Sequence, residues 1–158
     1  MTRISRLTVK EMPEKQLVTI RRTIDFFAEY SEMMGEVLQK IDKVLTASKL
    51  LPASGPIVCF HNVDLAALDV EIGMEIAFPI VLKESEVQYK TIPACKIALT
   101  IDQGPYEEQD PTLEALMAWI NEQGYSMAGG IYYHYLNDEE QLPKDYLTEM
   151  YIPINMKE

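Results

Sequence analysis

The chain has 158 residues, of which 47% are hydrophobic, and a formal net charge of −11 at pH 7. This length suits a single domain with a well-buried core and is short for two independent ones. Residues 102–158 carry 12 acidic and 2 basic side chains, and therefore most of the net charge. Such a surface repels a polyanionic backbone, which argues against direct nucleic-acid binding and favours a cationic ligand or a basic protein partner. The alternative is that these charges form a solvated acidic face whose only role is to keep the protein in solution.

The first half of the chain predicts strands around one long helix. From Phe26 to Leu45, apolar side chains follow three-and-four spacing, which is typical of an amphipathic helix of about five turns. Alternating or continuous apolar runs flank this helix on both sides. The strands expected in this half are residues 6–12, 16–22, 57–62 and 68–80.

The second half predicts the same order of elements with a shorter helix. Asp110 is expected to cap this helix, Pro111 to occupy its first turn, and Gly124 to end it. Trp119 falls on one flank of the apolar stripe, and Tyr106 follows a Gly-Pro turn that leads into the helix. The strands expected in this half are residues 86–92, 94–102, 129–136 and 146–154.

A short pattern occurs twice in the chain, 74 residues apart. Residues 74–80 (Met-Glu-Ile-Ala-Phe-Pro-Ile) and 148–154 (Thr-Glu-Met-Tyr-Ile-Pro-Ile) share Glu, Pro and Ile. We therefore expect one domain, residues 1–158, that contains a duplication, with repeat one at about 4–81 and repeat two at about 84–156. The order of elements predicts an α+β fold, a duplicated β-β-α-β-β unit whose antiparallel sheets are each covered by a helix.

The two cysteines and the overall hydropathy exclude several classes of protein. Cys59 and Cys95 lie in apolar strand-like runs without CxxC or His-rich spacing, so we predict no disulfide, no metal site and no cofactor. No run of 18 apolar residues occurs, and the N-terminus lacks the apolar stretch of a signal peptide. We expect a soluble, cytoplasmic protein that does not enter a membrane.

Period-two alternation assigns the side chains of the expected strands to two faces. In residues 68–80, the face expected under the helix includes Phe78, and the opposite face, with Glu71 and Glu75, is expected to be acidic and to face solvent. At the offset of 74, Glu149 takes the place of Glu75. The full sets are Val70, Ile72, Met74, Ile76 and Phe78 under the first helix, Thr148, Met150, Ile152 and Ile154 under the second, and Leu147, Glu149 and Tyr151 on the opposite face.

Glu149 among aromatic side chains predicts a ligand site. A carboxylate in an apolar cleft is costly to desolvate unless a cation pairs with it or it takes up a proton. Tyrosine rings add cation–π attraction of roughly 0.5 to 2 kcal/mol each. Glu149 as an ordinary strand carboxylate, and the tyrosines as ordinary sheet aromatics, remain alternatives. The candidate ligand-binding residues are Glu149, Tyr151, Tyr133, Tyr135, Trp119, Tyr106 and Leu147.

Five segments, in order, resemble GyrI-like effector-binding domains. These are residues 92–99 (Ile-Pro-Ala-Cys-Lys-Ile-Ala-Leu), 104–107 (Gly-Pro-Tyr-Glu), 116–120 (Leu-Met-Ala-Trp-Ile), 135–138 (Tyr-Leu-Asn-Asp) and 147–154 (Leu-Thr-Glu-Met-Tyr-Ile-Pro-Ile). Over nearly its whole length the chain is similar to the ligand-binding modules of AraC- and MerR-type multidrug regulators and to gyrase-inhibitory proteins.

The resemblance implies a cleft between two pseudo-symmetric halves that recognises lipophilic, often cationic, small molecules. Many members carry a pocket glutamate two residues before the Tyr of the Tyr-Leu-Asn-Asp motif, where this chain has Tyr133. Glu149, at the family's Thr-Glu position, is then the remaining carboxylate for a cation. Because Tyr133 replaces the usual pocket glutamate, neutral ligands are also compatible with this sequence.

The predicted function is small-molecule binding by a stand-alone protein, because the first repeat begins within ten residues of Met1 and leaves no room for a helix-turn-helix. The protein would sequester a lipophilic ligand or report it to a protein partner. The first alternative is an acidic interaction module, such as a DNA gyrase inhibitor. The second is a hydrolase of electrophilic natural products, although no nucleophile elbow, metal spacing or phosphate loop is present, and we assign no catalytic residue. His61 and His134 are interpreted as partly buried polar residues.

Overall fold

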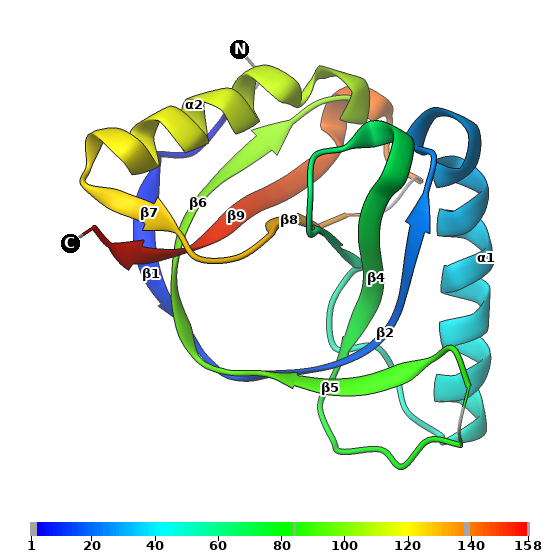
Figure 1. Ribbon diagram of the computed structural model, residues 1–158. Helices are drawn as coiled ribbons and strands as arrows, with labels where there is room; N and C mark the ends of the chain where they lie inside the picture. Colours follow the sequence, from blue (N-terminus) through cyan, green and yellow to red (C-terminus); the bar gives the residue numbers. More distant parts are fainter. Residues whose placement is uncertain (1–2, 84, 138–139, 158) are drawn as a thin grey trace. The chain divides into compact units, whose positions relative to one another are not determined.

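The structure of the chain is a computed structural model that describes residues 3–83, 85–137 and 140–157. The chain divides into two compact units, of which unit 1 comprises Met1–Pro13 and Ala94–Glu158, and unit 2 comprises Glu14–Pro93. Each unit contains an antiparallel sheet and one α-helix of more than three turns (Figure 1). The α+β class predicted from the order of elements is therefore confirmed.

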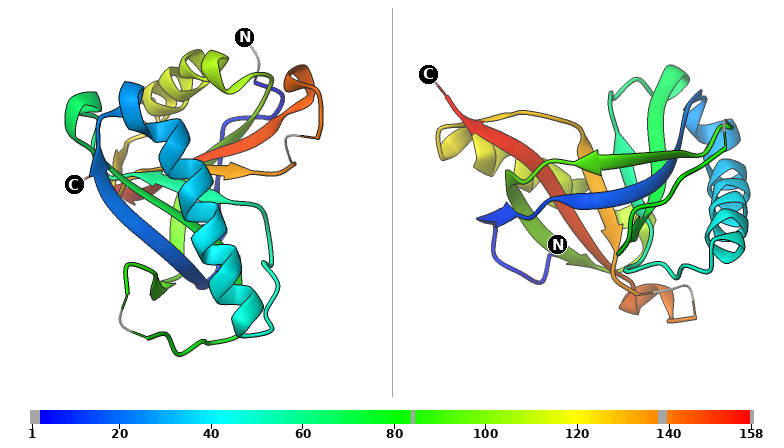
Figure 2. Two further views of the ribbon diagram at one scale, coloured as in Figure 1. Left: turned by 90° about the vertical axis from the view of Figure 1, so that its right-hand side faces the viewer. Right: turned by 90° about the horizontal axis from the view of Figure 1, so that it is seen from below.

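Unit 2 is built on a four-stranded antiparallel sheet with the order β3-β4-β2-β5. Helix α1 (Phe26–Ala47) packs against β4 and β2 and runs along one side of the unit (Figures 1 and 2). Its buried positions are four residues apart and belong to the predicted apolar stripe: Met33, Val37, Ile41 and Leu45. The strands of this sheet are β2 (Lys15–Ile24), β3 (Ile57–Phe60), β4 (Leu68–Ile76) and β5 (Gln88–Ile92), and a 3-10 turn, η1 (Leu65–Ala67), precedes β4.

Three predictions for the 68–80 strand are wrong. The strand ends at Ile76, and Phe78, expected under the helix, is 65% exposed beyond it. The cause is the pairing, because Ile76 already lies opposite Gln16, next to the first residue of β2, and no partner remains for later residues. Glu71, expected to face solvent, is buried.

Unit 1 has a sheet with the order β1-β6-β9-β8, and the short β7 pairs with the C-terminal end of β9. Figure 2 shows β6, β9 and β8 running beside one another, as their pairing requires. The sequence did not predict β7, which spans only three residues. The strands are β1 (Thr8–Met12), β6 (Cys95–Gln103), β7 (Tyr125–Met127), β8 (Ile131–Tyr135) and β9 (Leu147–Met156), with 3-10 turns η2 (Tyr106–Glu108) and η3 (Pro143–Asp145).

Helix α2 (Asp110–Glu122) covers one face of the unit 1 sheet. The Thr112 hydroxyl donates to Asp102 Oδ1 at 2.6 Å, and Gln109 Nε2 donates to Thr148 Oγ1 at 2.8 Å. The prediction that Asp110 caps the helix is wrong, because Asp110 is the first helical residue, and the side chain of Gln109, which holds the cap position, makes no capping hydrogen bond to the helix. Gly124, at φ +80°, follows the last turn as expected.

The side chains that β9 places under α2 are those predicted from alternation. Thr148, Met150 and Ile152 are fully buried, and Ile154 is 4% exposed. The alternate residues of the same strand, Glu149 and Tyr151 among them, lie on the face that α2 does not cover. Neither helix of the described residues is long and apolar enough to cross a membrane.

Candidate functional site

Strand pairing in unit 1 brings Glu149 and a set of aromatic and basic side chains onto one face of the sheet. Tyr151 lies opposite Tyr132 in β8 and Leu99 in β6, and Glu149 lies opposite His134. Because opposite partners point to the same side, these residues share the face that α2 does not cover. We call this surface the Glu149 face and define it as Lys10, Met12, Ile97, Leu99, Tyr132, His134, Glu149 and Tyr151.

The larger part of the Glu149 face is apolar. Met12, Ile97, Leu99 and Tyr151 form one buried cluster, against which the ring of Tyr132 packs. The Tyr132 and Tyr151 rings are stacked, with centroids 4.8 Å apart and planes 6° from parallel. Tyr151 is only 3% exposed, whereas Tyr132 is half-buried, so of the two rings Tyr132 is the one that keeps part of its surface accessible.

The polar part of the face is a carboxylate between two basic groups. Glu149 has a side chain only 13% exposed, with Lys10 Nζ 3.7 Å from Oε2 and His134 Nδ1 3.8 Å from Oε1. Within the described residues, the buried Nε2 of His134 has no hydrogen-bond partner. An ionised carboxylate this far from water requires positive charge nearby, and on this face Lys10 supplies it.

Two of the seven predicted site residues belong to this face, and a third lies on the same side of its strand. Glu149 and Tyr151 belong to it, and Leu147 lies half-buried two residues before Glu149 on the same side of β9. Tyr133 and Tyr135 point to the opposite face, because they pair with Met150 and Thr148. The structure thus separates Tyr133 and Tyr135 from Glu149.

The remaining predicted residues lie away from Glu149, around α2. Tyr106 stacks on Tyr146, with ring centroids 4.7 Å apart, and its ring lies 5.0 Å from that of Tyr135. Trp119 is half-buried on α2. Tyr133 is 7% exposed, and burial raises the pKa of its phenol above the ordinary value, with smaller contributions from Tyr135 and Asp110.

Six of the eight members of the Glu149 face were not among the predicted site residues, and Tyr132, His134 and Lys10 are the polar or aromatic ones among them. Tyr132 and His134 alternate with Tyr133 and Tyr135, so the register of β8 against β9 was needed to choose between the two sets. Lys10 comes from β1, near the other end of the chain, and reaches Glu149 across β6. No local pattern points to this contact.

The Tyr-Leu-Asn-Asp motif positions the start of β9. Asn137 Nδ2 donates to the Asp145 carbonyl at 2.8 Å, and the Leu147 amide donates to Asn137 Oδ1 at 2.9 Å. These bonds fix the chain where it enters the strand that carries Glu149. The last residue of the motif, Asp138, lies outside the described residues.

Unit 2 contains a Lys–Glu pair at the same place in its own register. Lys10 and Glu149 lie opposite two residues of β6 that are four positions apart, Ile97 and Ile101. Lys90 and Glu71 likewise lie opposite Leu17 and Arg21 of β2, also four positions apart. By pairing, the counterpart of Glu149 is thus Glu71, and not Glu75 as the offset of 74 suggested.

The Glu71 carboxylate is saturated with hydrogen bonds. Lys90 Nζ lies 2.9 and 3.0 Å from its two oxygens, the Thr19 hydroxyl donates at 2.7 Å, and His61 Nε2 lies 2.9 Å from Oε1. Burial by itself would raise the pKa of Glu71, but the bonds from Lys90, Thr19 and His61 outweigh it, and the pKa is lowered. Glu71 is therefore an ionised, internally compensated group.

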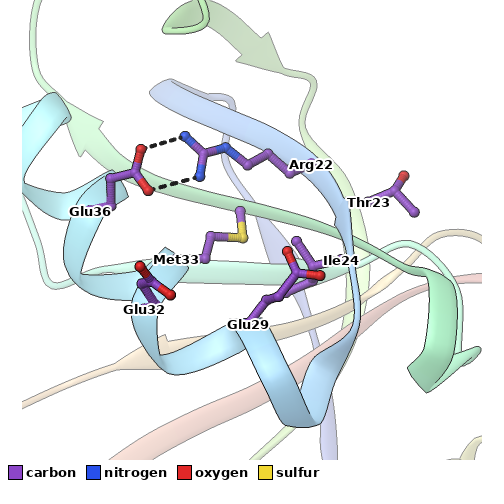
Figure 3. A pocket seen from close by; sticks show the side chains of 7 residues that line it. All are labelled: Arg22, Thr23, Ile24, Glu29, Glu32, Met33 and Glu36. Atoms are coloured by element: carbon purple, nitrogen blue, oxygen red, sulfur yellow. Dashed lines mark hydrogen bonds and ion pairs between the residues drawn. The ribbon is translucent and has the colours of Figure 1, made fainter.

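A second feature of unit 2 is a groove of about 470 Å³ between α1 and β2 (Figure 3). Two of the residues that line it pair with each other, since the Arg22 guanidinium donates to both carboxylate oxygens of Glu36. Arg22 also donates to Glu86 at 2.6 and 2.7 Å. The groove is lined by Arg22, Thr23, Ile24, Glu29, Glu32, Met33 and Glu36.

The described residues contain no group of three or more His, Cys, Asp or Glu side chains that could hold a metal ion. Residues 6–155 match the family model described as GyrI-like small molecule binding domain. The chain belongs to this family of ligand-binding domains.

Several solved structures share the fold of this chain. The crystal structure of the EcmrR C-terminal domain is 21% identical, with a TM-score of 0.85 over 97% of this chain and 99% of that chain. The EcmrR–DNA complex matches equally well, and this chain spans 58% of the EcmrR chain in it. SAV2435 bound to tetraphenylphosphonium (13% identity, TM-score 0.59, 95% and 94% covered) and a hydrolase from Listeria innocua (14%, 0.66, 96% and 94%) share the fold. No curated protein matches this chain in sequence.

Proposed function

We propose that the chain binds lipophilic cations on the Glu149 face, with Glu149 as the anionic partner. The observation that carries this proposal is the position of Glu149, 13% exposed and two residues from Tyr151 in the stacked Tyr132–Tyr151 pair. A small-molecule-binding family is the expected context for such a surface. The seven candidates of the sequence analysis are reduced to those on this face, with Tyr132 and His134 added.

The physical argument rests on desolvation. A bulky organic cation is weakly hydrated, so moving it from water onto an apolar surface costs little and removes hydrocarbon from water. The Glu149 carboxylate has already lost most of its water on folding, and its attraction for a cation is therefore screened less than at an exposed site. The half-buried ring of Tyr132 adds cation–π attraction and contact area for aromatic substituents, and the buried ring of Tyr151 stacks behind it.

We further propose that the protein acts in one of two ways: it sequesters the ligand, or it reports the bound ligand to a protein partner. Residues 102–158, which include the greater part of unit 1, hold 12 acidic and 2 basic side chains. A basic partner surface would be attracted to them, and the association would weaken with salt.

Titration calorimetry with tetraphenylphosphonium, the ligand in the SAV2435 structure, tests the proposal. We expect wild type to bind, and Glu149→Gln to bind at least about tenfold more weakly, or about 1.4 kcal/mol. Glu32→Gln in the α1 groove changes the net charge equally and should stay within about twofold of wild type. Equal affinities for wild type and Glu149→Gln would remove Glu149 from the site. A loss specific to Glu32→Gln would move the site to the groove.

A further inference from the structure

We infer that Lys10 is an exchangeable counter-ion of Glu149, which occupies the carboxylate in the free protein and is displaced by the positive group of a ligand. Lys10 then decides how strongly the site selects cations over neutral compounds of the same shape. This inference rests on the proposed function, because it names the residue that a bound cation replaces.

The first observation is that the Lys10–Glu149 pair is loose. Lys10 Nζ lies 3.7 Å from Glu149 Oε2, which is an ion-pair distance and longer than a direct hydrogen bond. Lys10 is 50% exposed, on the terminal strand β1, which has β6 as its only partner in the sheet order of the described residues. A lysine head on a flexible stem can leave such a pair and become hydrated again at little cost.

The second observation is that the same fold builds a tight version of this pair. In unit 2, Lys90 Nζ contacts both oxygens of Glu71 at 2.9 and 3.0 Å, and Thr19 donates a third bond at 2.7 Å. The difference follows from the neighbours. Leu99 takes the register position of Thr19, so the hydroxyl donor of unit 2 is replaced by a hydrocarbon side chain.

The third observation is the position of Tyr151 beside the loose pair. In unit 2 its register position holds Gly73, where an added Cβ would lie 2.6 Å from Thr19 Cγ2 and 2.8 Å from the Val18 carbonyl oxygen. Unit 2 therefore has no room for a side chain there, and the carboxylate is surrounded by donors of the protein itself. In unit 1 the corresponding space is filled by an aromatic ring.

Exchange explains how the site would choose among ligands. A cation that takes the place of the Lys10 ammonium keeps Glu149 paired with a positive charge, and Lys10 moves into water. A neutral ligand in the same place would leave a buried carboxylate without its counter-ion, which is unfavourable. His134, 3.8 Å from Glu149, remains on the other side of the carboxylate during the exchange.

The test combines an observation of Lys10 with a set of affinities. In NMR spectra, adding tetraphenylphosphonium to wild type should move the Lys10 ε-CH₂ signal toward its position in Glu149→Gln. The Lys96 signal should not move, because Lys96 lies 3.9 Å from the exposed Glu11 instead. A Lys10 signal that is the same in wild type, in Glu149→Gln and with ligand overturns the inference.

The second part of the test compares the affinities of the Lys10 and Lys96 variants for the ligand. Lys10→Met should strengthen tetraphenylphosphonium binding about three- to tenfold, whereas Lys96→Met, which removes the same charge, should change it less than about twofold. Neutral triphenylphosphine oxide cannot replace the Lys10 charge and is therefore expected to bind with the pair intact, so its affinity should change less than about twofold in both variants. In the Glu149→Gln background, Lys10→Met should have no effect.

The two claims fail in different ways. If wild-type binding depends on Glu149 but Lys10→Met behaves like Lys96→Met, the exchange is wrong and the proposed function stands. If no cation binds while the Lys10 signal still responds to Glu149→Gln, the pair forms but is not a ligand site, and both the exchange and the proposed function are wrong.

Discussion

The two units carry the same Lys–Glu pair at matching positions of their sheets, but surround it with different side chains. In unit 2, Glu71 receives bonds from Lys90, Thr19 and His61, and its charge is compensated within the protein. In unit 1, Glu149 shares its face with the Tyr132–Tyr151 stack and lies 3.7 Å from a half-exposed Lys10. The same position in the register thus holds a carboxylate enclosed by hydrogen-bond donors in unit 2, and a carboxylate beside an aromatic stack and a longer ion pair in unit 1, where we propose that a ligand binds.

The largest predicted difference between the two units is in stability. Glu71→Ala should lower the free energy of unfolding by about 3 kcal/mol, because it leaves Thr19 and Lys90 without their acceptor inside the sheet. The control is Glu75→Ala on the same strand and face, where Ser54 Oγ lies 3.3 Å from the carboxylate. Its cost should stay below about 1 kcal/mol. Urea unfolding measures both, and equal losses would contradict a structural role for Glu71.

Filling the space at Gly73 should have the next largest effect. Gly73→Ala places a Cβ against Thr19 and the Val18 carbonyl, and should cost about 2 kcal/mol in the free energy of unfolding. Gly35→Ala, in α1, meets no atom within 4 Å and should instead stabilise the protein by about 0.5 to 1 kcal/mol. Thermal unfolding of the two variants checks the opposite signs. A neutral Gly73→Ala would mean that unit 2 has room for a side chain beside Glu71.

The Tyr132–Tyr151 stack should contribute a smaller coupling within unit 1. Tyr132→Leu and Tyr151→Leu each remove one ring, and the double variant completes a cycle. Rings 4.8 Å apart and nearly parallel should give a coupling free energy of about 1 kcal/mol. Additive losses in urea unfolding would show that the rings are neighbours without mutual attraction.

The pH dependence of stability should distinguish Glu71 from the surface carboxylates. The pKa of Glu71 is lower in the folded protein than the ordinary 4.5, so its contribution is present above that pH and is lost as pH falls through the folded value. Hydrogen bonds from Arg22 also lower the pKa of Glu36, to about 2, and of Glu86, but these exposed pairs are screened by salt.

In high salt, therefore, Glu71→Gln should show a smaller loss of stability between pH 5 and the folded pKa than wild type does. Denaturant midpoints across this range measure the slope. Identical slopes for the two proteins would mean that Glu71 is not stabilised in its ionised form by Lys90, Thr19 and His61. The proposed difference between Glu71 and Glu149 would then be wrong.

Alternation along β9 was sufficient to predict which of its side chains lie under α2. Met150 and Ile152 are fully buried there, and Glu149 and Tyr151 are on the other side, as expected. The helices were predictable for the same reason, since their apolar stripes repeat locally. A residue's face within one strand depends only on its neighbours in sequence.

The equivalence between the two halves was not predictable from the repeated heptapeptide. It aligns Glu149 with Glu75, whereas pairing aligns it with Glu71, four residues earlier. Because side chains in a strand alternate with a period of two, residues four positions apart lie on the same face, and the predicted face of Glu149 was still correct. Lys10 and Tyr132 were missed because their proximity to Glu149 is created by strand pairing, which depends on register between distant segments.

A structure of the chain with tetraphenylphosphonium bound tests the central claim most directly. We predict the phosphonium centre near the Glu149 carboxylate and within about 6 Å of the Tyr132 or Tyr151 ring, with Lys10 turned into solvent. Ligand in the α1 groove, among Glu29, Glu32 and Glu36, or against Glu71 with the Lys10–Glu149 pair intact, would contradict the account.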